Sequence, residues 1–244
     1  MSKPPPKPSI SAVLPAYNEE ANIRRVTEGL RRALAQECER FEIIIVDDGS
    51  TDATPEIANA LAREWAEVRV IHHRPNAGYG VALRDGFTSA RMPLVFYTDS
   101  DGQFVPGEIR LLVERIGDAD IVTGYRAERQ DAWNRKFFSW GFRKFIGLVF
   151  GVHVRDCDCA FKLYRRELFG EVRIASTMFF VDAEVLAKAN VLGYRIEEVP
   201  VTHLPRAGGR STVRLGHILT TLREAWRLFR RPDLPVRRPK QGRA

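Results

Sequence analysis

Residues 41–52 read FEIIIVDDGSTD, an apolar run that ends abruptly in a polar turn. A short run rich in β-branched residues predicts a buried strand, and the Gly-Ser-Thr-Asp sequence after it predicts a turn. Similar runs occur before and after this stretch, at residues 10–14, 68–71, 94–97 and 120–123. We therefore expect at least five strands of the kind that pair in a parallel sheet.

Helical patterns separate these strands. They cover residues 19–36, 54–65, 81–90 and 106–116. Strands that alternate with helices at this spacing predict right-handed crossovers and a mainly parallel sheet covered on both faces. The first 125 residues are therefore predicted to form a Rossmann-like α/β unit.

Polar clusters follow three of the predicted strands, at residues 15–19, 47–52 and 99–103. Each cluster alone fits helix caps or turns. However, the carboxyl ends of parallel strands meet at one edge of a sheet, where ligands bind, so the carboxylates are expected to converge. Such carboxylates repel one another unless a cation or a ligand offsets the repulsion. Asp99 and Asp101, two apart on a turn, suit a hard divalent ion that also holds a diphosphate.

The positive charge of the chain is concentrated near its end. The whole chain has a net charge of +7, yet residues 203–244 hold eleven Lys and Arg against two acidic residues. The remainder is slightly acidic. This asymmetry indicates that residues 203–244 bind a polyanion, either anionic lipid or nucleic acid. The three cysteines are too few for a disulfide framework, which favours a reducing compartment.

Two segments, residues 133–150 and 213–231, have apolar stripes with aromatic residues beside a basic face. Such helices lie in membrane interfaces, although the same stripe also fits a helix packed on its own domain. The most apolar stretch, residues 145–154, is about half as long as a bilayer span. Residues 1–8 lack the apolar core of a signal peptide. We therefore expect no membrane crossing.

The motifs in both halves of the chain resemble a known family. In the first half, VLPAYNE at 13–19, VDDGSTD at 46–52, NAGYG at 76–80 and the DXD element at 99–101 resemble family 2 glycosyltransferases of the GT-A fold. The second half resembles the dolichyl- or polyprenyl-phosphate mannosyltransferases of that family. Its matching pieces are GYR at 124–126, Asp156 with AFKL at 160–163, FVDAE at 180–184, and VPV at 199–201 leading to RAGGRS at 206–211. The resemblance covers roughly residues 9 to 230.

The resemblance implies a role for each matching residue. The nucleotide-sugar pocket would be formed by Pro15, Tyr17, Glu19, Asp47, Asp48, Asp99, Ser100, Asp101 and Gln103. Mg²⁺ or Mn²⁺ would be held by Asp99 and Asp101, the acceptor phosphate by Arg126, Arg135, Arg206 and Ser211, and catalysis would depend on Asp99, Asp101, Arg126 and Asp182. Asp182 equally fits a helix cap. Relatives often carry Lys where this chain has Thr212, so Arg210 or Arg214 is a candidate for that charge. The five histidines form no metal set and receive no role.

The expected activity follows from this resemblance. It is the inverting transfer of a sugar, mannose or glucose first among the candidates, from a GDP- or UDP-sugar to a polyprenyl or dolichyl phosphate. The expected location is cytoplasmic, peripheral on the cytosolic face of a membrane, and an integral-membrane partner subunit is left open. One alternative is a family 2 enzyme acting on a saccharide hydroxyl. Another is a non-catalytic protein whose basic tail binds nucleic acid, which the acidic clusters disfavour; no nucleic-acid partner is expected.

The expected organisation is a single α/β domain with extensions. Residues 1–8 are predicted to be a flexible Pro-rich segment, and residues 9–212 the GT-A domain, with a nucleotide-sugar half to about 125 and an acceptor half from about 126. Residues 213–231 would form the basic amphipathic helix, and residues 232–244 a flexible basic tail.

Overall fold

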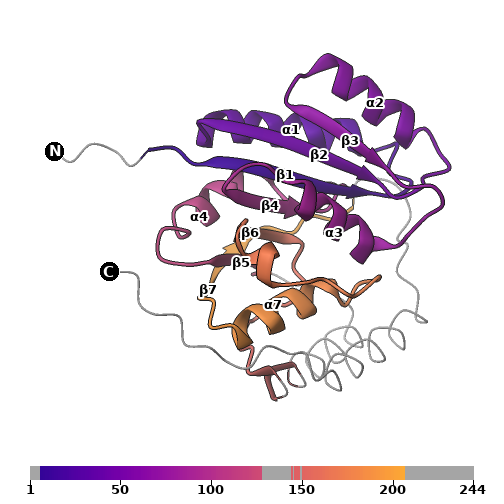
Figure 1. The fold of residues 1–244 in the computed structure, drawn as a ribbon. Coiled ribbons are helices and arrows are strands. Elements are labelled where there is room, and N and C mark those ends of the chain that lie inside the picture. The colour runs from indigo at the N-terminus through magenta and orange to yellow at the C-terminus, as the bar shows by residue number, and fades with distance from the viewer. Residues whose placement is uncertain (1–5, 128–143, 145, 149, 207–244) are drawn as a thin grey trace.

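The strands join in one mixed sheet in the order β3-β2-β1-β4-β6-β5-β7 (Figure 1). The computed structural model describes residues 6–127, 144, 146–148 and 150–206. The strands are β1 (Ser9–Ala16), β2 (Arg40–Asp47), β3 (Val68–His72), β4 (Leu94–Thr98), β5 (Ile121–Arg126), β6 (Phe161–Arg165) and β7 (Ile196–Val201). All five strands expected from the sequence are present: four are longer than expected by one to three residues, and β5 begins one residue later and ends three residues later than expected.

Strand β6 is the exception to the parallel pattern. It pairs antiparallel with both β4 and β5, whereas β1 pairs parallel with β2 and β4, β2 with β3, and β5 with β7. Two antiparallel pairings in succession leave β5 running in the same direction as β4. The carboxyl ends of β1, β2, β4 and β5 therefore share one edge of the sheet.

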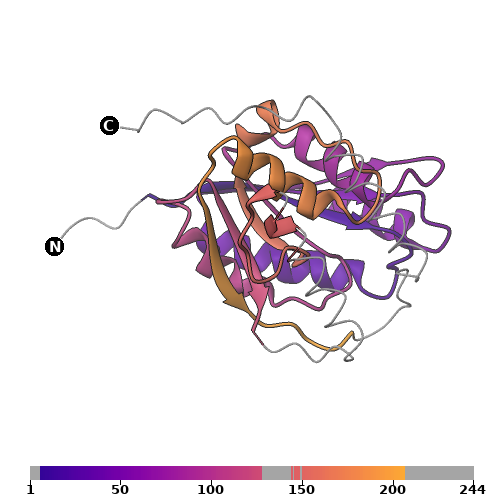
Figure 2. The same ribbon diagram turned by 90° about the horizontal axis from the view of Figure 1, so that it is seen from below.

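Helices cover both faces of this sheet. They are α1 (Ile23–Glu37), α2 (Thr54–Glu64), α3 (Tyr79–Ser89), the short η1 (Pro106–Glu108) and α4 (Ile109–Val113), α6 (Leu168–Glu171) and α7 (Val181–Val191). Helix α1 packs with α2 and α4, while α3 lies across the sheet from α1, against β1 and β2 (Figure 2). A Cβ at Gly86 of α3 would lie 2.4 Å from a methyl of Val13, so glycine permits this close packing. The prediction of an α/β fold with a mainly parallel sheet is confirmed.

The first helix begins at Ile23, later than the expected residue 19. Residues before it form a turn because neighbouring side chains accept their backbone N–H groups. The N–H of Glu19 donates to Thr54 Oγ1 (2.8 Å) and that of Glu20 to Asp52 Oδ2 (3.2 Å). Asn18 has a φ of 55°, which ends the strand sharply. This turn keeps Glu19 at the sheet edge. The helix expected at 106–116 is likewise divided into η1 and α4.

A buried carboxylate, Glu42 in β2, fastens three strands of the sheet. It accepts hydrogen bonds from Ser11 Oγ (2.7 Å), Arg69 Nε (2.7 Å) and the Arg91 N–H (2.8 Å). Burial raises the pKa of Glu42, but these donors outweigh it and leave the pKa below its ordinary value. The ionised form is therefore favoured in the folded protein.

Replacing Glu42 by Gln should lower the free energy of unfolding at pH 7 by about 1 to 3 kcal/mol, because charge-assisted hydrogen bonds are weakened. A carboxyl with a lowered folded-state pKa stabilises above its unfolded pKa, and this contribution is lost as the pH falls through the folded value. Urea unfolding between pH 7 and pH 3 should therefore show a flatter profile for E42Q than for wild type. E39Q, at an exposed position, is the matched control; identical profiles for all three proteins would contradict this role.

No helix among the described residues is long and apolar enough to cross a membrane. The expected amphipathic helix at 213–231, most of the one at 133–150, and the C-terminal tail lie outside the described residues. The division into domains stays a prediction.

Candidate active site

The DXD element forms a turn directly after β4. The Asp99 carboxylate accepts a hydrogen bond from the Tyr79 hydroxyl (2.8 Å), and Ser100 Oγ donates to the Pro15 carbonyl (2.7 Å). Asp101 Oδ1 accepts from the Gln103 N–H (3.0 Å) across Gly102, whose φ is 74°. The turn is thus attached to β1 through Ser100 and to α3 through Tyr79.

The negative charges of the two carboxylates of this turn lie close together. Burial, together with the nearby charge of Asp101, raises the pKa of Asp99 to about 7 against the opposing effect of the Tyr79 hydrogen bond. Hard divalent cations prefer carboxylate oxygens, and Mg²⁺ in particular uses one or two carboxylates together with substrate phosphates and water. The described residues contain no group of three or more metal-ligating side chains. Asp99 and Asp101 therefore fit an ion whose other ligands come from a diphosphate and water.

The loop after β1 contributes two of the expected residues. The side chain of Tyr17 is 36% exposed, and Glu19 is buried. Glu19 Oε2 accepts from Asn22 Nδ2 (2.9 Å), and Glu19 Oε1 from Arg206 Nη2 (2.7 Å). Arg206 also contacts Asp101 Oδ2 at 3.3 Å. Arg206 thus joins the β1 loop to the DXD turn.

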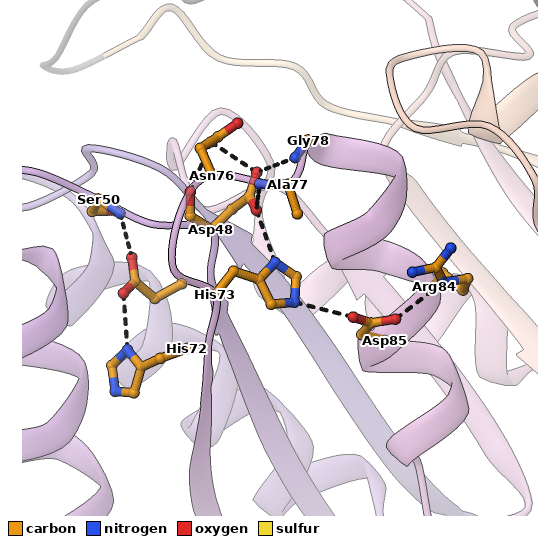
Figure 3. A network of polar contacts seen from close by, with 10 residues as sticks. Asp48, Ser50, His72, His73, Asn76, Ala77, Gly78, Arg84 and Asp85 are labelled. Carbon is orange, nitrogen blue, oxygen red and sulfur yellow. Dashed lines mark hydrogen bonds and ion pairs between the residues drawn. The ribbon is translucent and has the colours of Figure 1, made fainter.

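Asp48, at the end of β2, holds the loop that leads into α3 (Figure 3). Its carboxylate accepts from the N–H groups of Ala77 and Gly78 and from Asn76 Nδ2, each at 2.9 Å, and contacts His73 Nδ1 at 2.8 Å. A carboxylate has about four acceptor positions, and these contacts use that capacity. The geometry therefore shows that Asp48 fixes the loop between β3 and α3.

The two histidines at the end of β3, His72 and His73, also belong to this network. His72 Nδ1 contacts Asp47 Oδ2 at 2.8 Å, and His73 Nε2 contacts Asp85 Oδ2 at 3.1 Å (Figure 3). The other Asp47 oxygen accepts the Ser50 N–H (3.1 Å). No role for these histidines could be predicted from their spacing in the sequence. The missed signal is their position at the end of a strand beside one that ends in two aspartates.

Arg126, at the end of β5, is oriented by Asp156. Arg126 Nε and Nη2 donate to the two Asp156 oxygens at 2.6 and 2.8 Å. Burial lowers the pKa of Arg126, but Asp156 outweighs it and the pKa is raised. Nη1 takes no part in this bidentate pair. Arg126 lies at the same edge of the sheet as Asp99.

A buried ion pair joins α7 to the sheet. Lys162 of β6 has no exposed surface, and its ammonium lies 2.6 Å from Asp182 Oδ1 and 2.5 Å from the Cys159 carbonyl. The Tyr97 hydroxyl donates to the same Asp182 oxygen. Burial lowers the pKa of Lys162, but the charge of Asp182 outweighs it and raises the pKa. The N-cap position of α7 is Phe180, so Asp182 does not cap the helix.

The structure brings most of the expected nucleotide-side residues together at one edge, around β1, β2 and β4. Gln103 Nε2 donates to the Leu204 carbonyl (2.9 Å), which fastens the chain after β7 to the DXD turn. Arg135 and Ser211 lie outside the described residues. Tyr79 lies in the NAGYG motif and Lys162 in the AFKL motif, but the motifs alone predict no role for either residue. Neither polarity nor spacing identifies them, since their partners come from distant strands.

The comparison with protein families agrees with this arrangement. A model described as glycosyl transferase family 2 matches residues 11–173. The chain belongs to glycosyl transferase family 2. The matched region contains the DXD turn, Arg126 with Asp156, and Lys162, so the described site lies mainly within the part that the family shares.

Several relatives carry names of lipid-phosphate enzymes. The chain is 34% identical to dodecaprenyl-phosphate galacturonate synthase of Rhizobium johnstonii, over 83% of this chain and 61% of that protein. It is 34% identical to a dolichyl-phosphate beta-glucosyltransferase of Trichomonas vaginalis, over 79% of this chain and 64% of that protein. The chain thus spans less than two thirds of the length of these relatives.

The fold is also found among solved structures. Glucosyl-3-phosphoglycerate synthase from Mycobacterium tuberculosis, in complex with Mn²⁺, UDP-glucose and phosphoglyceric acid, is similar with a TM-score of 0.72 and 22% identity. The match covers 93% of this chain and 81% of that one. At this identity the likeness shows the fold alone, and that fold is the GT-A type expected from the motifs.

Proposed function

We propose that this family 2 protein transfers a sugar, with inversion, from a nucleoside diphosphate sugar to a polyprenyl phosphate. The observation that carries the proposal is that carboxylates and guanidinium groups lie at the same edge of the sheet. Asp101 of the DXD turn lies beside Arg206, and Arg126 ends β5 at the same edge of the sheet. The names of the relatives support a lipid phosphate as the acceptor.

The donor would bind at the ends of β1, β2 and β4. Pro15, Tyr17 and Glu19 would border the base and ribose, and Asp47 and Asp48 would shape the loops around them. Asp99 and Asp101 would hold Mg²⁺ or Mn²⁺ with Gln103 beside them. The ion would offset the charge that develops on the leaving diphosphate.

The acceptor phosphate would be bound by Arg126, Arg206, Arg135 and Ser211. Guanidinium groups match phosphate oxygens in a forked geometry. A phosphate monoester has a second pKa of about 6 and is mostly dianionic at neutral pH, so no general base has to deprotonate it. Asp182, fixed by Lys162 and Tyr97, would then orient a sugar hydroxyl or the acceptor rather than remove a proton.

The lipid acceptor places the reaction at a membrane surface. The basic residues of 213–231 would attract anionic lipid headgroups, each contributing on the order of 1 kcal/mol near the surface. The cytosolic face is the proposed side, because nucleotide sugars are expected there, and an integral-membrane subunit would be an additional anchor.

The test of this function is transfer of radiolabel. Purified protein would be incubated with vesicles containing polyprenyl phosphate and, separately, with labelled UDP-glucose, GDP-mannose and other nucleotide sugars. Label from one donor should enter the organic extract, and only when the polyprenyl phosphate is present. Label that appears instead on soluble saccharides would favour a hydroxyl acceptor, and no transfer from any donor would contradict the proposal.

Replacing Arg126 by Ala should raise the acceptor KM while leaving nucleotide binding nearly unchanged. The expected loss is about 1.5 to 3 kcal/mol, the range for a hydrogen bond to a charged group. Arg155→Ala is a matched control, because Arg155 is a nearby arginine stacked on the Tyr125 ring at 4.5 Å. An equal loss of donor affinity in R126A would place Arg126 on the diphosphate side.

A further inference from the structure

Arg206 lies on a segment that is attached to the DXD turn by backbone contacts. The Leu204 N–H donates to the Gln103 carbonyl (2.7 Å), and Gln103 Nε2 returns a hydrogen bond to the Leu204 carbonyl. Thr202 upstream is held by Glu108 through its N–H (2.8 Å). The backbone next to Arg206 is therefore fixed to the DXD turn. The Arg206 guanidinium can still change partners by rotation of the side chain.

The guanidinium is only partly satisfied where it lies. Nη2 serves two carboxylates, Glu19 at 2.7 Å and Asp101 at 3.3 Å. Nη1 is buried and has no hydrogen-bond partner among the described residues. A buried donor without an acceptor is costly, because it has lost its hydration. Its position beside the diphosphate site indicates that a further acceptor, such as a phosphate oxygen, binds this guanidinium in another state.

One arginine pairs with two carboxylates at this place. Glu19 and Asp101 both lie within ion-pair distance of Arg206, and the charge of Asp99 lies close to that of Asp101 in the same turn. A divalent ion at Asp101 would compete with the guanidinium, because both neutralise the same oxygen and like charges repel. The ion would neutralise the turn more fully than a single positive charge does.

We propose that Arg206 is the internal counter-ion of Asp101 and Glu19 until the divalent ion arrives with the donor, and that the guanidinium then turns to the acceptor phosphate. This inference rests on the proposed function, since it assumes the metal site at Asp101. It makes Arg206 the residue that sets the order of binding. The donor and its ion bind first, and their arrival frees the group that recognises the acceptor.

A second arginine beside the same turn provides a matched control. Arg25 of α1 lies so close to Gly102 that a Cβ there would be 2.3 Å from Arg25 Nη2. Arg25 Nη2 donates to the Asn22 amide oxygen (3.1 Å) rather than to Asp101. Removing Arg25 therefore changes the charge near the turn without removing a direct partner of the proposed metal ligand.

The experiment measures Mn²⁺ binding without an acceptor. Wild type, Arg206→Gln and Arg25→Gln would be titrated with Mn²⁺ alone, and the free ion would be followed by electron paramagnetic resonance. Loss of the competing guanidinium should lower the apparent Kd of R206Q by about two- to fivefold, the scale of a partly exposed ion pair. R25Q should stay close to wild type. Thermal unfolding of each variant would confirm that the proteins are folded.

A second measurement follows the guanidinium itself. In arginine-labelled protein, the Arg206 side-chain NMR signal, assigned by its loss in Arg206→Lys, should shift on addition of Mg²⁺ with UDP or GDP. Equal or weaker Mn²⁺ binding in R206Q, or an unchanged Arg206 signal, would overturn the inference while leaving the proposed function intact. Failure of wild type to bind Mn²⁺ alone or with either nucleotide would instead contradict the metal site of the proposed function.

Discussion

Replacing Asp101 by Asn is expected to lower sugar transfer by about two to three orders of magnitude, the scale of the several kcal/mol that a metal ion contributes to transition-state charge stabilisation. Asn keeps the side-chain oxygen that accepts the Gln103 N–H, so the turn and the fold should survive. The change removes the negative charge that a divalent ion needs. The variant should therefore lose activity without losing stability.

The measurement combines transfer assays with metal removal. Wild-type activity should stop in EDTA and return with Mn²⁺ or Mg²⁺, whereas excess metal should not rescue D101N. Asp118→Asn, an exposed change away from the sheet edge, should behave like wild type. Full wild-type activity in EDTA would mean that Asp99 and Asp101 form only a structural turn.

Replacing Lys162 by Met is expected to lower the free energy of unfolding by about 3 to 5 kcal/mol, because it leaves the buried Asp182 carboxylate without its cation. Lys162 has no exposed surface, and its ammonium lies 2.6 Å from Asp182. The double variant K162M/D182N removes both charges and keeps an acceptor for the Tyr97 hydroxyl. It should recover most of the lost stability.

Urea denaturation of the single and double variants measures this coupling. Arg110→Met is the matched control, because Arg110 forms an exposed pair with Glu114 at 3.9 Å, and its loss should cost at most about 1 kcal/mol. A loss below about 1 kcal/mol in K162M, with no recovery in the double variant, would mean that the pair contributes little net stability.

The general plan of the fold could be predicted from local patterns. Runs such as residues 41–46 bury β-branched side chains, and the alternation with helices leaves only a right-handed, mainly parallel arrangement. The expected strands and most helices are present. The start of α1 was placed too early, because Thr54 and Asp52, distant in the sequence, hold residues 19 and 20 in a turn.

The candidate site could be predicted only as a set of residue types. Asp99 and Asp101 are visible as a pair because they stand two apart in one turn. Lys162 reads as an ordinary charged residue in a short strand, and only its pairing between β4 and β5 places it in the core beside Asp182. His72 and His73 likewise gain their partners from β2, at the neighbouring strand end.

The α/β fold class, the family motifs and the carboxylate-rich strand ends follow from spacing along the chain, and local patterns are enough to recognise them. Which charges pair with one another follows only from the folded structure. Arg206 reaches Glu19 across 187 positions and Asp101 across 105, and Arg126 reaches Asp156 across 30. The strength of an ion pair depends on the distance between its charges and on their burial. The antiparallel strand β6 and the segment after β7 determine both quantities here, because they bring the second half of the chain back against the first.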